Sequence, residues 1–175
     1  FLVPADADGM ERAVYDTPHG TRVGKIRFEA LSLPSTALIA AGRDAEERLV
    51  AMRDSITAAV CAEAVGLMRS MLKMTVAYAK DRKQFGEALA KFQVLRHRMA
   101  DMYAEVEAAE SAAALACNMV GKCDAVADAK LRINEALTTI THGAIQIHGG
   151  IGTTAELELS GYVHRALAII HEYRP

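Results

Sequence analysis

The strongest constraint on the fold is a stripe of apolar residues that recurs at alternating intervals of three and four through the middle of the chain. Its members are Phe92, Leu95, Met99, Met102, Val106, Ala109 and Ala113. This period places all of them on one face of a helix of roughly 30 residues, and that face must be buried against other helices. Methionines at this spacing are far more often core residues than a special binding surface.

Three further helices are predicted around this one. The first runs from about residue 45 to 81, the striped helix starts near Glu87, and the third covers about 125–147. The fourth follows the diglycine of "HGGIG". Four long helices with short connections predict a mainly α fold, an antiparallel up-down four-helix bundle.

Helix-capping residues mark two of the expected starts. "GKCD" ends the second helix, and Asp124 is of a residue type that caps the helix that follows. "TTAE" is expected to open the fourth helix, because Thr153 and Glu156 have the spacing of a capping box.

Residues 1–42 carry a β pattern instead. "FLVPA" predicts a short apolar strand, and Pro18-His19-Gly20 is a turn signal. In "KIRFEA" apolar and polar residues alternate, which is the period of a half-buried strand. These strands are too few to close a sheet. We therefore expect residues 1–42 to be the end of a larger β domain and residues 43–175 to be the helical bundle.

Composition excludes several classes of function. A net charge of −2 does not favour a basic, nucleic-acid-binding face. The three cysteines lack CxxC spacing, and His142 and His148 are six residues apart, so we expect a reducing compartment and no metal site. We find neither a signal peptide nor an apolar run that looks long enough to span a membrane, and we predict a cytoplasmic protein.

Two corners between helices carry residues that a plain turn does not need. "KDRKQFGEALAKFQ", residues 80–93, puts Arg82 and Phe85 beside a helix-breaking glycine. "HGGIGTTAE" puts a diglycine before a helix start, where backbone N–H groups favour an anion. Taken alone, the diglycine is more simply a tight turn, and Arg82 and Lys83 are more simply solvated charges.

The two corners together resemble a known family. "YAKDRKQFGEALAKFQVLRHRMADM", followed further along by "IQIHGGIG", is similar to the C-terminal domain of the acyl-CoA dehydrogenase family, with its R-x-x-F-G, F-Q and Q-x-x-G-G elements. "GTRVGKIRFEALSLPSTALI" resembles the last strands of the family's middle β domain. The resemblance covers the whole chain, which would correspond to about the C-terminal half of a typical member.

The resemblance implies a flavoprotein that introduces an α,β double bond into an acyl-CoA thioester. FAD would lie across a subunit interface, with its ADP half at the two corners of the neighbouring subunit. Arg82 would pair with the pyrophosphate and Phe85 would pack on the adenine side. The implied partners are the acyl-CoA substrate and another family subunit, in a homo-oligomer or hetero-oligomer. The implied FAD contacts are Arg82, Gln84, Phe85, Gln93, Gln146, Gly149 and Gly150.

The catalytic base is where this sequence departs from the family. The family's two glutamate positions correspond here to Tyr173, after the fourth helix, and to Ile56 or Thr57 on the first helix. None of these is a carboxylate. Glu172 would be the base after a one-residue shift, and an ordinary surface glutamate is the alternative. Arg165 would face CoA or flavin, or only solvent.

Three functional hypotheses follow. The first is an FAD-dependent acyl-CoA dehydrogenase of lipid or steroid side-chain catabolism. The second is a non-catalytic subunit of a heteromer, which supplies half of the FAD site and the assembly interface. "GGIGTTAELELSGYVHRALA" is more similar to divergent chains of that kind, which act on bulky thioesters. The third is a plain helical scaffold in which both corner motifs are only turns.

Overall fold

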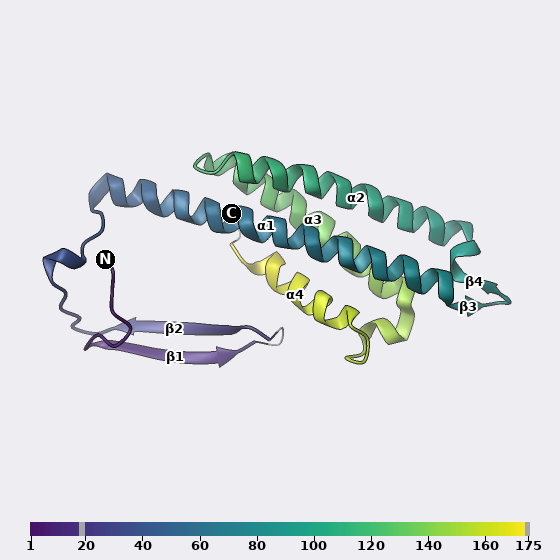
Figure 1. Cartoon of the computed structure of the whole chain (residues 1–175), viewed down its shortest axis with the longest axis horizontal. Coiled ribbons are helices and arrows are strands. Elements are labelled where there is room, and N and C mark those ends of the chain that lie inside the picture. Colours follow the sequence, from purple (N-terminus) through teal and green to yellow (C-terminus); the bar gives the residue numbers. More distant parts are fainter. Residues whose placement is uncertain (18–19, 174–175) are drawn as a thin grey trace. The chain divides into compact units, whose positions relative to one another are not determined.

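The computed structural model describes residues 1–17 and 20–173 (Figure 1). The chain divides into two compact units, Phe1–Val50 and Ala51–Pro175. Four α-helices dominate it, so the predicted mainly α, four-helix class is confirmed. Their bounds are α1 Gly42–Asp81, α2 Gln93–Asn118, α3 Cys123–His148 and α4 Leu159–His171.

The first unit contains one antiparallel hairpin. Strand β1 (Met10–Asp16) pairs with β2 (Arg22–Phe28), and Thr17 Oγ1 donates a hydrogen bond of 2.7 Å to the carbonyl of Thr21 beside the turn. The turn predicted at residues 18–20 lies partly outside the described residues, because 18 and 19 are not among them.

Two expectations for this unit are wrong. "FLVPA" forms no strand, since the N–H of Leu2 donates instead to the carbonyl of Ala37, in the 3-10 turn η1 (Ser35–Ala37). The alternation in β2 does not produce a half-buried face either. Every β2 residue is exposed, because no other layer of the described residues buries either face of this two-stranded sheet.

The bundle core confirms the apolar stripe on α2. From Met99 to Ala113 the members of the stripe are buried, while Phe92 and Leu95 at its start are half-buried. Figure 1 shows α1 and α3 running in one direction and α2 and α4 in the other. The largest fully buried apolar side chains come from all four helices: Met68, Met71, Met102, Val106, Ile133, Leu137, Ile140, Leu159 and Ile169.

The second helix starts later than predicted. Instead of resuming at Glu87, the chain forms a short hairpin from β3 (Lys83–Gln84) and β4 (Glu87–Ala88), then a 3-10 turn, η2 (Leu89–Lys91). Phe92 is the N-cap residue of α2. The helix therefore begins at Gln93 rather than at Glu87, because the intervening backbone is used to reverse the chain.

The predicted caps of α3 and α4 are also wrong. Residue Lys122, with no side-chain cap bond, is the N-cap of α3, and Asp124 lies within its first turn. Thr153 belongs to a 3-10 turn, η3 (Gly149–Thr153), and its hydroxyl donates to the carbonyl of Gly150 at 2.9 Å. A hydroxyl bonded backwards in this way does not cap a following helix, and α4 starts at Leu159.

Polar contacts tie the helices together at several levels. Asp54 of α1, 3% exposed, accepts the N–H of Gly121 in the α2–α3 turn at 3.2 Å. Arg132 of α3 pairs with Glu105 of α2 at 2.6 Å. A buried carboxylate needs such donors, because an unpaired charge in a core costs roughly 3–5 kcal/mol. The α2–α3 turn is thereby fastened to α1.

By length and composition alone, α1 is long and apolar enough to cross a membrane, which corrects the expectation that no such run exists. Half of its most apolar window is buried within the structure. A central helix of a bundle has the same properties, because it meets other helices on much of its surface.

Two glycines give opposite predictions for stability. An alanine Cβ at Gly152 would lie 3.0 Å from the Cβ of His148 and 3.1 Å from the carbonyl oxygen of Ile145, whereas at Gly66 it would meet open space. Gly152→Ala should lower the free energy of unfolding by about 1–3 kcal/mol. Gly66→Ala should raise it by about 0.5–1 kcal/mol, because alanine favours the helix. Urea unfolding of both variants tests this, and equal effects would contradict the close contact at Gly152.

Candidate functional site

The corner between α1 and α2 is a tight hairpin with a strained aromatic at its tip. The open end of this hairpin is closed by a backbone hydrogen bond, in which the carbonyl of Arg82 accepts the N–H of Leu89 at 2.8 Å. Phe85 has a φ angle of 55° and Gly86 one of 84°. Two successive positive values are what a type I′ turn requires. For a bulky residue such as Phe85 this backbone is an outlier, of the kind that gathers at functional sites.

The ring of Phe85 remains available for contact. Its side chain is 92% exposed, and its one ring neighbour among the described residues is Phe92, met edge-on with centroids 6.2 Å apart. Phe92 immediately precedes Gln93, the first residue of α2. The exposed ring therefore lies by the start of α2, with most of its surface uncovered.

The second corner is the diglycine between α3 and α4. Gly149 ends α3 with a φ of 67° and a ψ of -145°. Residues with a side chain rarely adopt this conformation. Gly152, three residues later, is buried against α3. The chain thus turns closely around the end of α3.

A stacked pair joins the two corners. The ring of Tyr78, in the last turn of α1, stacks on the imidazole of His148, the last residue of α3, with centroids 4.4 Å apart and planes at 28°. The Tyr78 hydroxyl also donates to the carbonyl of His148 at 3.3 Å. His148 is 5% exposed, and its Nδ1 donates to the carbonyl of Ala144 at 2.8 Å. The corners consequently lie at the same end of the bundle.

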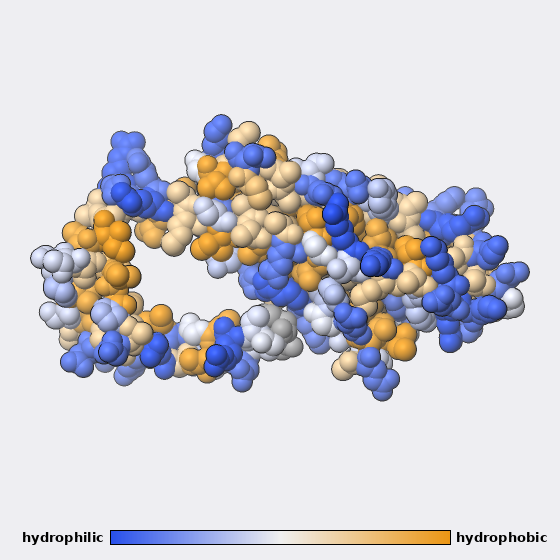
Figure 2. Space-filling model, viewed as in Figure 1, coloured by the Kyte–Doolittle hydropathy of each residue, from blue (hydrophilic) through white to orange (hydrophobic). Residues whose placement is uncertain are grey.

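All seven residues expected to contact FAD are exposed around this end. Figure 2 shows that the end carrying β3 and β4 is largely hydrophilic on the face in view. Within the described part of the chain, the side chains of Arg82, Gln84, Gln93 and Gln146 make no hydrogen bond or ion pair, so their donors are free for a ligand. Their assignment as FAD contacts stays a prediction.

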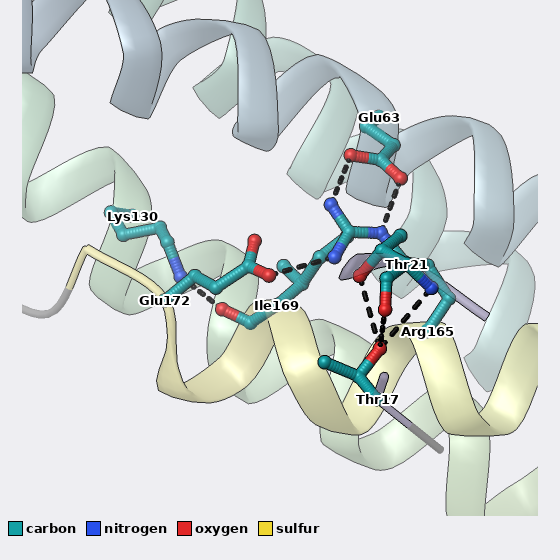
Figure 3. A network of polar contacts seen from close by, with 7 residues as sticks. All are labelled: Thr17, Thr21, Glu63, Lys130, Arg165, Ile169 and Glu172. Carbon is teal, nitrogen blue, oxygen red and sulfur yellow. Dashed lines mark hydrogen bonds and ion pairs between the residues drawn. The ribbon is translucent and has the colours of Figure 1, made fainter. Parts of the chain in front are cut away.

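Glu172 lies elsewhere. It follows the last residue of α4, which extends from Leu159 to His171. A helix of this length spans about 20 Å, so Glu172 and the diglycine are at opposite ends of α4. Figure 3 shows its carboxylate held by Arg165, whose Nη1 donates at 2.8 Å. The structure does not bring the expected base to the two corners.

Arg165 bridges two carboxylates. Its Nε and Nη2 donate to both oxygens of Glu63 on α1, at 2.6 and 2.7 Å, in addition to the bond to Glu172 (Figure 3). These hydrogen bonds, first that to Glu63, raise the pKa of Arg165 above its usual value. The guanidinium is therefore engaged within the chain rather than turned to solvent.

The family's alternative position for a base offers no titratable group. Ile56 is half-buried, and Thr57 is buried with its hydroxyl bonded to the carbonyl of Arg53 at 2.8 Å. Cys61 is no nucleophile either, because burial raises the pKa of its thiol to about 11, although Lys130 partly offsets the effect. The described residues contain no cluster that could hold a metal ion.

Three residues that hold these sites together in the structure were not apparent from the sequence. Tyr78 lies one helical turn before Arg82, and His148 directly precedes the diglycine, so each neighbours a motif. Their mutual contact joins residues 70 positions apart and follows from the fold alone. Glu63 is likewise 102 positions from Arg165.

Comparison with known proteins identifies the family. The model of the acyl-CoA dehydrogenase C-terminal domain matches residues 45–170. The chain belongs to the acyl-CoA dehydrogenase family. The match covers nearly all of the bundle and both corners, and members of this family use FAD.

Individual acyl-CoA dehydrogenases agree with this assignment. The chain is 42% identical over 113 residues to acyl-CoA dehydrogenase IpdE2 of Mycobacterium tuberculosis, covering 65% of this chain and 35% of that protein. It is 32% identical over 166 residues to the short-chain specific mitochondrial enzyme of Homo sapiens, covering 90% and 40%. The chain spans less than half the length of these relatives.

A solved structure shows the same fold. The ChsE4-ChsE5 complex from Mycobacterium tuberculosis superposes with a TM-score of 0.80 at 24% identity, covering 95% of this chain and 47% of that one. At this identity the likeness concerns the fold alone.

The contact between Tyr78 and His148 yields a matched pair of predictions. Tyr78→Ala should lower the free energy of unfolding by about 2–3 kcal/mol, because the half-buried stacked ring is lost. Tyr78→Phe keeps the ring and removes one long hydrogen bond, so its cost should be below about 1 kcal/mol. Urea unfolding measures both values. An alanine variant no less stable than the phenylalanine variant would show that the stack does not hold the corners.

Proposed function

We propose that this chain is part of an FAD-dependent acyl-CoA dehydrogenase and that the two joined corners receive the ADP half of FAD from a neighbouring subunit. One observation carries the proposal. Arg82, unpaired among the described residues, and the exposed, strained Phe85 lie at the same end of the bundle as a diglycine turn that is far from them in the sequence, and the Tyr78–His148 stack lies beside both corners.

The residues at the two corners fit the ADP half of FAD. Arg82 offers a fork of N–H donors that suits a phosphate, and no carboxylate among the described residues occupies it. Phe85 offers an open ring face for adenine. Gln146 can both donate and accept, and the turn at Gly149 lets the backbone approach a ligand closely.

In the proposed reaction, a base removes the α-proton of an acyl-CoA thioester while a hydride leaves the β-carbon. FAD, when bound, would serve as the oxidant for this reaction. The residues of this chain at the two corners bind and orient the ADP half, because they touch a part of the cofactor that does not react. Lipid-derived or steroid side-chain thioesters are the substrate class that we propose.

Removing Arg82 tests the corner directly. Arg82→Ala should weaken FAD retention by about 10- to 150-fold, because a charge-assisted hydrogen bond to phosphate is lost. Lys83→Ala, an equal change of charge at the next residue, should have little effect. Equilibrium titration of FAD into the flavin-free protein measures both, and equal affinities in the two variants would refute the cofactor role of this corner.

A second candidate function is that of a subunit without its own base. It is favoured by the ion pair of Glu172 with Arg165, together with the lack of a carboxylate at Tyr173, Ile56 or Thr57. A phenol, a threonine hydroxyl and an isoleucine side chain are each a poor substitute for a carboxylate as general base. The carboxylate would then come from a different subunit of a heteromer. The ChsE4-ChsE5 complex, which shares this fold, is itself named as an assembly of two chains.

The two candidates predict different behaviour of the flavin. If the base comes from a partner, the flavin bound to the protein alone should be bleached slowly or not at all when acyl-CoA thioesters are added under anaerobic conditions. Addition of the partner should then accelerate bleaching. Fast bleaching by the protein alone would refute the heteromer, and its loss in Glu172→Gln, with FAD still bound, would make Glu172 the base.

A further inference from the structure

A groove lined by both apolar and polar residues runs between α2 and α3 beside the diglycine end. Its volume is about 480 Å³, and Met102 and Gly143 contribute to its lining. An added Cβ at Gly143 would lie 2.9 Å from the Met102 sulfur, so the two helices meet closely here. Five polar side chains from both helices line the groove: Arg98, Asp101, Thr139, His142 and Gln146.

Four of these side chains are unsatisfied within the chain. In the part that the structure describes, Arg98, Asp101, His142 and Gln146 make no hydrogen bond or ion pair. The same helix pair does form such contacts elsewhere, since Arg132 of α3 meets Glu105 of α2 at 2.6 Å. Opposite charges that share a groove without pairing leave both groups free for a ligand.

The groove is continuous with the candidate FAD site. Gln146 belongs to both. It precedes Gly149 by three positions, about 4.5 Å along the helix axis. Thr139 and His142 lie on the same face of α3 as Gln146, because helical neighbours three and four apart share a face. A ligand bound at the diglycine therefore has a polar path along α3.

The chemistry of the groove selects a ligand with both anionic and hydroxyl groups. The fork of Arg98 suits a phosphate. The carboxylate of Asp101 accepts hydrogen bonds and repels anions, so it suits the hydroxyls of a sugar. Free phosphate alone would gain from Arg98 and lose against Asp101. A ribose joined to phosphate satisfies both.

We propose that this groove holds the ribose and phosphate groups of the ADP half of FAD, with Arg98, Asp101 and His142 as further cofactor-binding residues. The inference rests on the proposed function and extends its site beyond the two corner motifs. Arg98 contacts phosphate, Asp101 accepts from ribose hydroxyls, and His142, four residues before Gln146 on α3, is an additional hydrogen-bonding group.

The first arm of the test compares two arginines on one helix. Arg98→Ala should weaken the affinity of the flavin-free protein for FAD by about tenfold, the lower end of the range for a charged hydrogen bond, because the groove is open to water. Arg96→Ala is the matched control. It carries the same change of charge, on the opposite side of α2, since two residues turn the helix by about 200°. Equal affinities in the two variants would overturn the proposal.

The second arm separates ribose from a simple anion. Asp101→Asn should weaken FAD binding several-fold if the carboxylate accepts ribose hydroxyls, because an amide is the poorer acceptor. Tighter FAD binding in Asp101→Asn would show that the carboxylate acts only by repelling the anionic cofactor, and would overturn the ribose assignment. His142→Gln, which keeps a hydrogen-bonding group, should bind FAD more tightly than His142→Ala, and equal binding removes His142 from the site.

The third arm asks which half of the cofactor is involved. ADP should compete with FAD in the parent protein, and Arg98→Ala should raise the concentration of ADP needed, whereas FMN binding should be unchanged. An equal loss of FMN and ADP binding would overturn the proposal. If Arg82→Ala loses FAD while Arg98→Ala does not, the groove assignment fails and the proposed function stands. If neither variant loses FAD, both fail.

Discussion

The stacked contact between Tyr78 and His148 is the interaction on which the candidate site depends. It joins the last turn of α1 to the last residue of α3, and each helix delivers one motif directly beyond it. The Nδ1 bond to the Ala144 carbonyl holds the imidazole in one orientation. An aromatic pair of this kind contributes about 0.5–1.5 kcal/mol beyond its buried area, which is large for a contact that positions two exposed corners.

Helix existence could be predicted from this sequence, and so could the approximate starts of α1 and α3, whereas the starts of α2 and α4 could not. The stripe on α2 is a periodic signal over many residues, and packing confirmed it. The start of α2 was misplaced because Phe-Gly is an uncommon sequence for a type I′ turn, which usually contains Asn-Gly or Asp-Gly. The start of α4 was misplaced because the Thr153 hydroxyl bonds back to Gly150 instead of capping forward. Both errors come from local hydrogen bonds that residue spacing does not specify.

The motif residues of the site could be found from the sequence, but the residues that connect them could not. Arg82, Phe85 and Gln146 belong to short patterns with a family meaning. The Tyr78–His148 stack and the α2–α3 groove each combine side chains from separate helices, and only the packed bundle brings them together. The lack of a partner for Arg98 among the described residues is a property of the fold in the same way.

The ion pairs of Arg165 bear on the proposal that the base comes from another subunit. To abstract a proton, Glu172 would have to leave a hydrogen bond of 2.8 Å to a guanidinium that is also held by both oxygens of Glu63. A charged hydrogen bond contributes roughly 1.5–3 kcal/mol, so breaking it would oppose any movement of Glu172 toward a substrate. A shift of register that brought Glu172 toward a substrate would thus act against the contact that orders the end of α4. The chain has no carboxylate at the family's usual positions, and the neighbouring one, Glu172, is held in an ion pair with Arg165. Both facts support the proposal that the base comes from another subunit.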